Sequence, residues 1–250
     1  IRGGGAKQDP TEKKKRSKAA DGRVYFSYAM IHEAVSSLVP KVKEFNPDVI
    51  IAIGGGGFIP ARMLRTEVKV PILAVSLKLY DEATNTVGTE VEKVQWFDET
   101  SGVGKDVRGK RVLIVDEVDD SRKTLKYCVD EVRRTNAPAA IAVLVVHNKL
   151  REKKAQLPDD IVYLAAENVP NNWNCYPWDA AAYGNSIHQH ERIANECVNI
   201  ASKGEQKKDD ASSAHDDGKG MATTILSMRF VGIGCILGFI AGWTLSGRYK

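Results

Sequence analysis

Short apolar runs alternate with amphipathic stretches between residues 23 and 166. Runs rich in Val, Ile, Leu and Ala predict buried strands, and apolar residues repeated at i, i+3, i+4 and i+7 predict helices. We expect strands over 48–53, 70–77, 111–115, 139–146 and 161–165, and helices over 58–65 and 122–135. Because uninterrupted apolar strands alternate with helices, the pattern predicts an α/β fold with a mainly parallel central sheet flanked by helices.

Another helix is predicted ahead of the first strand. Its apolar residues share one face at helical spacing: Ile31, Val35, Leu38, Val42 and Phe45. Pro40 lies inside this repeat and lacks the backbone N–H that a helix interior needs. We therefore expect Pro40 to kink or divide the helix.

The pattern changes after residue 182. We expect a helix over 183–202 and then a flexible linker over 203–220, which has mixed charge, Gly and Ser but no large apolar side chain. Residues 230–245 contain no charged residue. Gly234, Gly238 and Gly242 in this segment are spaced four apart, a spacing that brings membrane helices together. Because about 20 apolar residues span a bilayer, residues 221–250 predict a separate C-terminal transmembrane helix. The alternative is a C-terminal core helix, which glycine disfavours in water.

Charge is concentrated at the N-terminus. Residues 1–22 hold seven basic residues against three acidic ones, so we expect a basic, disordered tail there. The whole chain has 36 basic and 32 acidic residues, which leaves 29 of each beyond the tail. A body without net charge argues against nucleic acid as a partner.

The cysteines and histidines show no metal-binding spacing. The four cysteines are scattered without a CxxC pair, which argues against a zinc site or a disulfide framework and fits a reducing compartment. His188 and His190 are separated by a single residue, but no other cluster of metal-ligating residues accompanies them. We expect these two histidines on an exposed polar helix face.

An acidic stretch follows the 111–115 strand. It reads Asp116-Glu-Val-Asp-Asp-Ser-Arg-Lys-Thr124 and places four acids within five residues at the end of a strand, where open α/β sheets bind ligands. The helix that begins next can attract a phosphate with its N-terminal N–H groups, and neighbouring carboxylates suit a sugar diol or a hydrated magnesium ion. Together they indicate a phosphorylated ribose. The alternative, acids that only cap the helix, is disfavoured because such acids repel without cation or hydroxyl partners.

This stretch resembles the phosphoribosyl-diphosphate (PRPP) motif of the type I phosphoribosyltransferases, in which two acids and two variable positions precede Asp-Ser/Thr-x-x-Thr. The resemblance implies that Asp116 and Glu117 hold the ribose hydroxyls and Mg²⁺. It implies that the 5′-phosphate is bound by Asp120, Ser121, Arg122, Lys123 and Thr124. It also makes Asp120 the catalytic residue, which exchanges a proton with the purine imidazole. Many family members carry Gly at the position of Arg122, a difference that bears on the subfamily.

Four consecutive glycines follow the 48–53 strand: Gly54, Gly55, Gly56 and Gly57. A ligand can approach the backbone N–H groups of such a loop directly, and no Gly-Lys-Ser/Thr follows, so the loop is not a P-loop. Beside the acidic motif, it resembles the pyrophosphate-binding loop of the 6-oxopurine phosphoribosyltransferases. Family members often place Lys or Arg in this loop. Here backbone amides and Mg²⁺ would hold the pyrophosphate, with help from Arg62 or Arg65.

Two further segments resemble the base-binding part of the xanthine–guanine and fungal-type hypoxanthine–guanine enzymes. Trp173 lies in an Asn-rich loop, where an indole face can stack on a planar heterocycle. The resemblance implies that Trp173 stacks on the purine, that the backbone around Asn174 and Cys175 reads its 2-position, and that Lys149 donates to its 6-oxo group. The alternative for Lys149 is a solvated surface lysine. For Trp178 we expect packing under the loop.

The stretch from residue 80 to 109 is long and polar for a connection in a compact domain. Its centre, 91–97, predicts one strand of a hairpin. The resemblance makes this stretch the small, flexible hood that closes over the active site. The alternative is a surface excursion without a role.

The resemblance covers residues 25–180 and implies a type I phosphoribosyltransferase domain over 23–182. The implied reaction transfers 5-phosphoribosyl from PRPP to guanine, hypoxanthine or xanthine, with Mg²⁺ as cofactor. We expect a homo-oligomer whose catalytic domain is cytoplasmic and whose C-terminal helix is in a membrane. Two alternatives stay open: a membrane-tethered regulator of the same fold that binds PRPP or a nucleotide without turnover, and a membrane adaptor.

Overall fold

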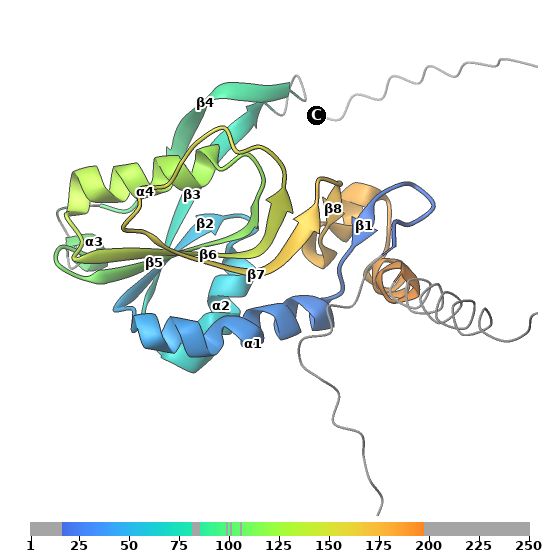
Figure 1. Cartoon of the computed structure of the whole chain (residues 1–250), viewed down its shortest axis with the longest axis horizontal. Coiled ribbons are helices and arrows are strands. Elements are labelled where there is room, and N and C mark those ends of the chain that lie inside the picture. The colour runs from blue at the N-terminus through green and yellow to red at the C-terminus, as the bar shows by residue number, and fades with distance from the viewer. Residues whose placement is uncertain (1–16, 82–85, 99, 101, 106, 198–250) are drawn as a thin grey trace, which may run out of the picture. The chain divides into compact units, whose positions relative to one another are not determined.

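The computed structural model describes residues 17–81, 86–98, 100, 102–105 and 107–197. Its centre is a six-stranded sheet with helices on both faces (Figure 1). The strands are β2 (Val49–Gly54), β3 (Ile72–Asp81), β4 (Thr86–Gln95), β5 (Arg111–Asp119), β6 (Ala140–Leu150) and β7 (Val162–Pro170). They lie in the order β4-β3-β2-β5-β6-β7, and only β3 and β4 pair antiparallel. The predicted α/β fold with a mainly parallel sheet is confirmed.

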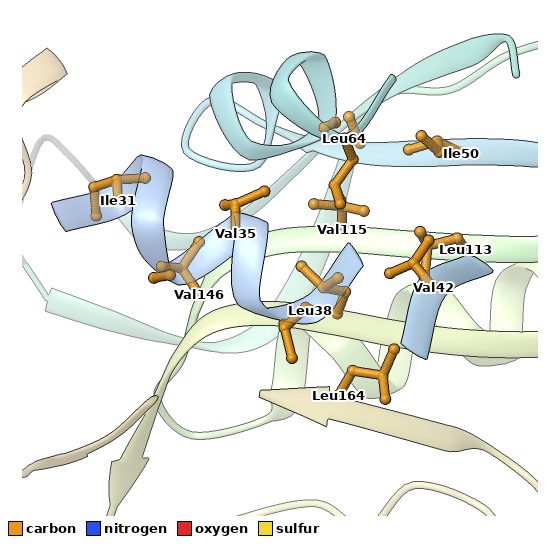
Figure 2. Close-up of a cluster of buried hydrophobic side chains, with 14 of the residues drawn as sticks. Ile31, Val35, Leu38, Val42, Ile50, Leu64, Leu113, Val115, Val146 and Leu164 are labelled. Atoms are coloured by element: carbon orange, nitrogen blue, oxygen red, sulfur yellow. The ribbon is translucent and has the colours of Figure 1, made fainter. Parts of the chain in front are cut away.

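Two hydrophobic cores fix the layers. The helices α1 (Tyr28–Phe45) and α2 (Phe58–Val68) cover one face of the sheet, and α4 (Lys123–Asn136) covers the other, while α3 (Gly102–Lys105) is short. Figure 2 shows how Ile31, Val35, Leu38 and Val42 of α1 pack against residues of the sheet and against Leu64 of α2. Burying these apolar faces against the sheet stabilises both layers.

The predicted division of the first helix at Pro40 is wrong, while a kink there stays a prediction. α1 is one helix of 18 residues that continues through Pro40. Pro40 is on the exposed side, while Leu38, Val42 and Phe45 are buried on the other side. Because these residues before and after Pro40 are buried in the core, their packing holds the helix together across the proline.

The strand that carries the acidic motif is longer than predicted. β5 continues to Asp119, and its backbone pairs with β6 as far as Asp119 opposite Asn148. The apolar run ends at Val115, but backbone pairing does not depend on apolar side chains. The first acids are therefore held on a strand and not on a loop.

The predicted hairpin is present. β3 and β4 form an antiparallel pair that projects from the sheet (Figure 1). Trp96 and Phe97, which follow β4, pack against the core under α4. The base of the hairpin is therefore anchored in the domain.

A second, small sheet joins the two ends of the domain. β1 (Val24–Tyr25) pairs in parallel with β8 (Asn174–Cys175), and a 3₁₀ helix follows over Pro177–Tyr183. Residues 187–197 are helical, within the predicted range 183–202. His190 on this helix is fully buried beside Tyr25, so the prediction of an exposed position is wrong for His190, although His188 is exposed. A local pattern could not show that this helix face packs on β1.

Several sequence predictions lie outside the described residues: the tail up to residue 16, the linker over 203–220 and the transmembrane helix over 221–250. Within residues 17–22, which we assigned to the tail, the Gly22 N–H closes a turn on the Ala19 carbonyl, and the Ser17 hydroxyl donates to the Cys197 carbonyl at 2.7 Å. Among the described helices, none is both long and apolar enough to cross a bilayer.

Candidate active site

A cavity of about 680 Å³ lies at the carboxyl ends of β2, β5 and β6. Every predicted site residue lines it except Gly57 and Cys175. Arg62 and Arg65 do not line it either, because both are exposed on α2. The cavity therefore brings together the acidic motif, the glycine loop, Lys149 and Trp173, which are far apart in the sequence.

Two glycines of the loop, Gly56 and Gly57, are packed closely against β5, whereas a side chain at Gly55 would meet no neighbouring atom. A Cβ on Gly56 would lie 2.0 Å from the carboxyl group of Glu117, and one on Gly57 would lie 2.4 Å from the Val115 carbonyl oxygen. Gly57 thus packs against the middle of β5 at the start of α2, which explains why it does not line the cavity. Gly54, Gly55 and Gly56 do line it, and the peptide bond between Gly54 and Gly55 is cis.

Asp116 and Glu117 face the glycine loop without a cationic partner. No ion pair between described residues includes either of them. Burial raises the pKa of Asp116 well above its ordinary value, and the negative charge of Glu117 raises it further. Burial and the charge of Glu117 also raise the pKa of Asp179, which lines the same cavity. A cation would relieve this repulsion, so the carboxylates fit a Mg²⁺ site.

The described residues contain no cluster of three or more His, Cys, Asp or Glu side chains arranged to hold a metal ion. Magnesium in phosphoryl sites usually takes one or two carboxylates and completes its shell with water and substrate oxygens. Asp116 and Glu117 are suited to supply those carboxylates.

Asp119 is the buried centre of a side-chain network. Its residue exposure is 1%. Its Oδ2 accepts hydrogen bonds from Arg122 Nε at 2.9 Å, Arg122 Nη2 at 2.7 Å and the Tyr163 hydroxyl at 2.8 Å. Its Oδ1 lies 3.4 Å from Lys153 Nζ, an ion pair rather than a hydrogen bond of good geometry. Two cations and a phenol thus compensate this carboxylate.

Asp120 contacts two cations at the edge of the cavity. Lys149 Nζ donates to its Oδ2 at 3.2 Å, and Arg151 Nη1 donates to its Oδ1 at 2.7 Å. Burial would raise the pKa of Asp120, but the charge of Lys149 and the hydrogen bond from Arg151 outweigh it and hold the pKa below its ordinary value. The Lys149 side chain is only 12% exposed, so Lys149 is not a solvated surface lysine.

The turn between β5 and α4 presents a helix N-terminus to the cavity. Arg122 precedes α4 with φ 69° and ψ −2°, a left-handed conformation that favours glycine. Ser121, Lys123 and Thr124 line the cavity next to it. The first N–H groups of a helix lack intrahelical partners and attract phosphate.

The Trp173 loop forms another wall. Trp173 lines the cavity and is 59% exposed, which leaves indole surface open to a ligand. The Trp173 and Cys175 carbonyls accept from the N–H groups of Val24 and Phe26 at 2.9 and 3.0 Å. Because peptide groups alternate in direction along a strand, the Asn174 carbonyl points away from β1. The Cys175 thiol packs in a small core with Tyr25, and burial raises its pKa to about 11.

Aromatic rings support this loop from below. Trp178 stacks on Tyr176 with ring centroids 4.9 Å apart and packs against the main core, so the expected packing role of Trp178 is confirmed. The Tyr176 hydroxyl lies 2.8 Å from His147 Nδ1, and His147 is buried. The side-chain amide of Asn174 is buried without a hydrogen-bond partner of good geometry.

Sequence reasoning missed several residues at this site. They are Arg151, Lys153, Tyr163, Tyr176 and Asp179, together with the separate role of Asp119. The basic residues after Lys149 could have indicated these contacts. They follow the predicted 139–146 strand, which pairs in parallel with β5, so they lie beside the acids at the end of β5. Nothing in the local sequence around Tyr163 indicated its contact with Asp119, 44 residues earlier.

Comparisons with known proteins agree with this geometry. Residues 27–181 match the family described as phosphoribosyl transferase domain. A hypoxanthine-guanine phosphoribosyltransferase of Schizosaccharomyces pombe is 42% identical over 195 residues, which cover 68% of this chain and 93% of the relative. Xanthine phosphoribosyltransferase 1 of Saccharomyces cerevisiae is 39% identical over 206 residues, or 70% of this chain and 97% of the relative.

A similar solved structure is that of a hypothetical protein from Neisseria gonorrhoeae with bound ppGpp. It is 39% identical, has a TM-score of 0.61, and the match covers 73% of this chain and 98% of that one. The family match spans more than half of the chain, and both curated relatives are at least 39% identical over more than two thirds of it. The chain therefore belongs to the phosphoribosyltransferase family.

Proposed function

We propose that this protein is a purine salvage enzyme that transfers 5-phosphoribosyl from PRPP to a 6-oxopurine. The observation that carries the proposal is the single cavity lined by the acidic turn, the glycine loop, Lys149 and Trp173. The relatives named hypoxanthine-guanine and xanthine phosphoribosyltransferases support the class of base.

PRPP would bind along the carboxyl end of the sheet. The N–H groups of residues 121–124, with Ser121, Lys123 and Thr124, would hold the 5′-phosphate. Asp116 and Glu117 would hold the ribose hydroxyls beside the glycine loop, whose amides would hold the pyrophosphate. Asp116 and Glu117 would also hold Mg²⁺, which supplies neutralisation of charge on the diphosphate oxygens.

The purine would bind between Trp173 and the Asp120–Lys149 pair. The 6-oxo group and N7 are neighbours on one edge of a 6-oxopurine, and this edge matches a donor and an acceptor that are 3.2 Å apart. Lys149 would donate to the 6-oxo group and Asp120 would accept from N7. An adenine presents a 6-amino donor to Lys149, which selects against it.

The transfer breaks the bond between ribose C1 and the pyrophosphate oxygen and forms a bond from C1 to N9 of the base. Positive charge builds on the ribose as in glycoside cleavage, and Asp116 and Glu117 lie where they can stabilise it. Asp120 is held as a carboxylate by its two cations. It can therefore accept a proton from the imidazole ring as the N9 bond forms.

The test is an assay of the full chain with PRPP and Mg²⁺. Guanine, hypoxanthine, xanthine and adenine are supplied separately, and formation of each nucleoside monophosphate is measured. The expected result is turnover with at least one 6-oxopurine and none with adenine. Turnover with adenine alone would contradict the proposal, and so would the absence of turnover with all four bases.

A second candidate function is favoured by the Neisseria structure, which holds ppGpp. Under it, this chain is a regulator of the same fold that binds PRPP or a guanine nucleotide without turnover. The same assay separates the two functions when calorimetry with PRPP is added. Binding of PRPP without product from any base would support the regulator.

We also propose that residues 221–250 anchor the protein in a membrane with the catalytic domain in the cytoplasm. The uncharged run over 230–245 supports this proposal. A fluorescent protein fused to residues 221–250 should localise to a membrane, and a diffuse signal would contradict the anchor. Homo-oligomeric assembly stays a prediction, which light scattering on the purified chain checks.

A further inference from the structure

Asp119 belongs to the acidic motif but has no part in the proposed chemistry. Its carboxylate is buried and compensated by Arg122, Lys153 and Tyr163. These partners come from the start of α4, from the connection after β6 and from β7. Such a set of contacts joins three elements at the turn that would bind the phosphate.

We propose that Asp119, Arg122, Lys153 and Tyr163 form a set of positioning residues, here called the Asp119 brace. The brace holds the 119–124 turn in the conformation that binds the 5′-phosphate and ties this turn to the base-binding strand β6. The inference rests on the proposed function for the identity of the ligand. It assigns Arg122 a positioning role in place of direct contact with the phosphate.

The geometry of Arg122 supports this role. Two of its guanidinium nitrogens donate to the same carboxylate oxygen of Asp119, and the group lies 4.8 Å from the ring centroid of Tyr163. The side chain is only 21% exposed. Meanwhile its backbone has φ 69°, which a residue with a side chain adopts at a cost. The ion pair and the stacking hold Arg122 in a conformation that glycine adopts freely.

Lys153 provides the connection to β6. Its ammonium donates to the carbonyl oxygens of Asp119 at 2.7 Å, Asp120 at 3.0 Å and Lys149 at 2.9 Å. These three bonds use all three of its N–H groups. One side chain therefore fixes the distance between the backbone of Asp120 and that of Lys149. Loss of Lys153 should disturb phosphate and base binding together.

The first test compares two substitutions of Arg122. Arg122→Ala removes the brace and keeps the unfavourable backbone conformation, so the KM for PRPP should rise by about 10- to 100-fold, the effect of misplacing binding groups. Arg122→Gly removes the side chain but allows φ 69° without strain, so its KM for PRPP should stay within about threefold of the wild type. Equal increases for both variants would make Arg122 a direct phosphate ligand and overturn the proposal.

The second test is Lys153→Met, which keeps an unbranched side chain of nearly the same length and removes its charge and its donors. The KM for PRPP and the KM for the base should rise together by about tenfold. Lys126→Met is the matched control: Lys126 on α4 does not line the cavity, is partly exposed and pairs with Asp130, so its substitution should leave both constants unchanged. A rise in only one constant, or none, would remove the proposed link between turn and strand.

Stability and ligand binding distinguish the possible failures. Thermal unfolding of each variant without ligand shows whether it is folded at the assay temperature, and calorimetry with PRPP gives its affinity without turnover. If the wild type makes no product with any base, the proposed function fails. The ratio of PRPP affinities between Arg122→Gly and Arg122→Ala still tests the brace in that case.

Discussion

The acidic motif contains two pairs of carboxylates that the structure treats in opposite ways. Asp119 and Asp120 are compensated by cations from Arg122, Lys153, Lys149 and Arg151, while Asp116 and Glu117 have no cation partner among the described residues. The pKa of Asp120 is lowered and that of Asp116 is raised. Cations of the protein thus compensate one pair, while the other pair is left for a cation or sugar hydroxyls to compensate.

This difference also explains how the protein accommodates the repulsion between the four acids of the motif. Four acids within five residues were expected to need cation or hydroxyl partners. The protein itself supplies the partners of the second pair, from residues 29 to 44 positions away or within the turn. For the first pair, Asp116 and Glu117, the bound ligands would supply the partners.

The largest effect on stability is expected at Asp119. Asp119→Asn leaves Arg122 and Lys153 without their buried counter-charge, which should lower the free energy of unfolding by about 3 kcal/mol. Glu117→Gln, as the comparison, should leave it unchanged or raise it slightly, because it relieves repulsion with Asp116. Urea unfolding of both variants measures this, and equal effects would mean that the two pairs do not differ.

The largest effect on activity within the compensated pair is expected at Asp120. Asp120→Asn should lower kcat by about 100-fold, the usual contribution of a positioned acid or base, while the dissociation constant of PRPP changes little. Steady-state rates and calorimetry measure the two quantities. Equal losses in turnover and in PRPP binding would remove the proton-transfer role.

Another compensated carboxylate, Glu131, does not line the cavity. Glu131 on α4 accepts from Arg134 and from Lys93 of β4, and the hydrogen bond from Arg134, opposed by burial and supported by Lys93, lowers its pKa to about 2. A lowered pKa stabilises the fold above the ordinary pKa of about 4.5, and this contribution is lost as the pH falls toward 2.

Glu131→Gln should therefore cost about 2 kcal/mol at pH 7, a figure reduced because Arg134 is largely exposed. The difference from the wild type should shrink as the pH falls from 5 to about 2. Urea unfolding at several pH values follows it. A constant difference across this range would show that the charge of Glu131 is not the cause.

The smallest effect is expected at Trp173, which contributes stacking and no charge. Trp173→Ala should raise the KM for the purine base by about tenfold, since stacking on one base contributes about 1–3 kcal/mol. The KM for PRPP should not change. Trp178→Ala is not a suitable control because Trp178 packs in the core. An unchanged KM for the base would place the base site elsewhere.

The sequence was sufficient for the existence of the six strands of the central sheet, the order of the motifs and the family, because these depend on local apolar runs and on short spacings. It did not predict β1 and β8, which pair across the domain, or the full length of β5. It was insufficient where distant segments meet. Burial of His190 depends on its packing against Tyr25, and the role of Asp119 depends on Tyr163 and Lys153. The uninterrupted α1 depends on which side of the helix Pro40 lies on. Each of these errors has the same physical origin, since tertiary contacts override local preference.

The pairing of β1 with β8 has a consequence for the synthesis of the chain. Val24 is made about 150 residues before its partner Asn174, which at 5–20 residues per second is roughly 10–30 s. During this interval the sheet and the acidic turn can form behind the ribosome, while β1 has nothing to pair with. The part of the cavity wall that carries Trp173 therefore forms after the sheet and the acidic turn. The part of the molecule proposed to distinguish one base from another is thus completed only after the part proposed to hold the sugar phosphate.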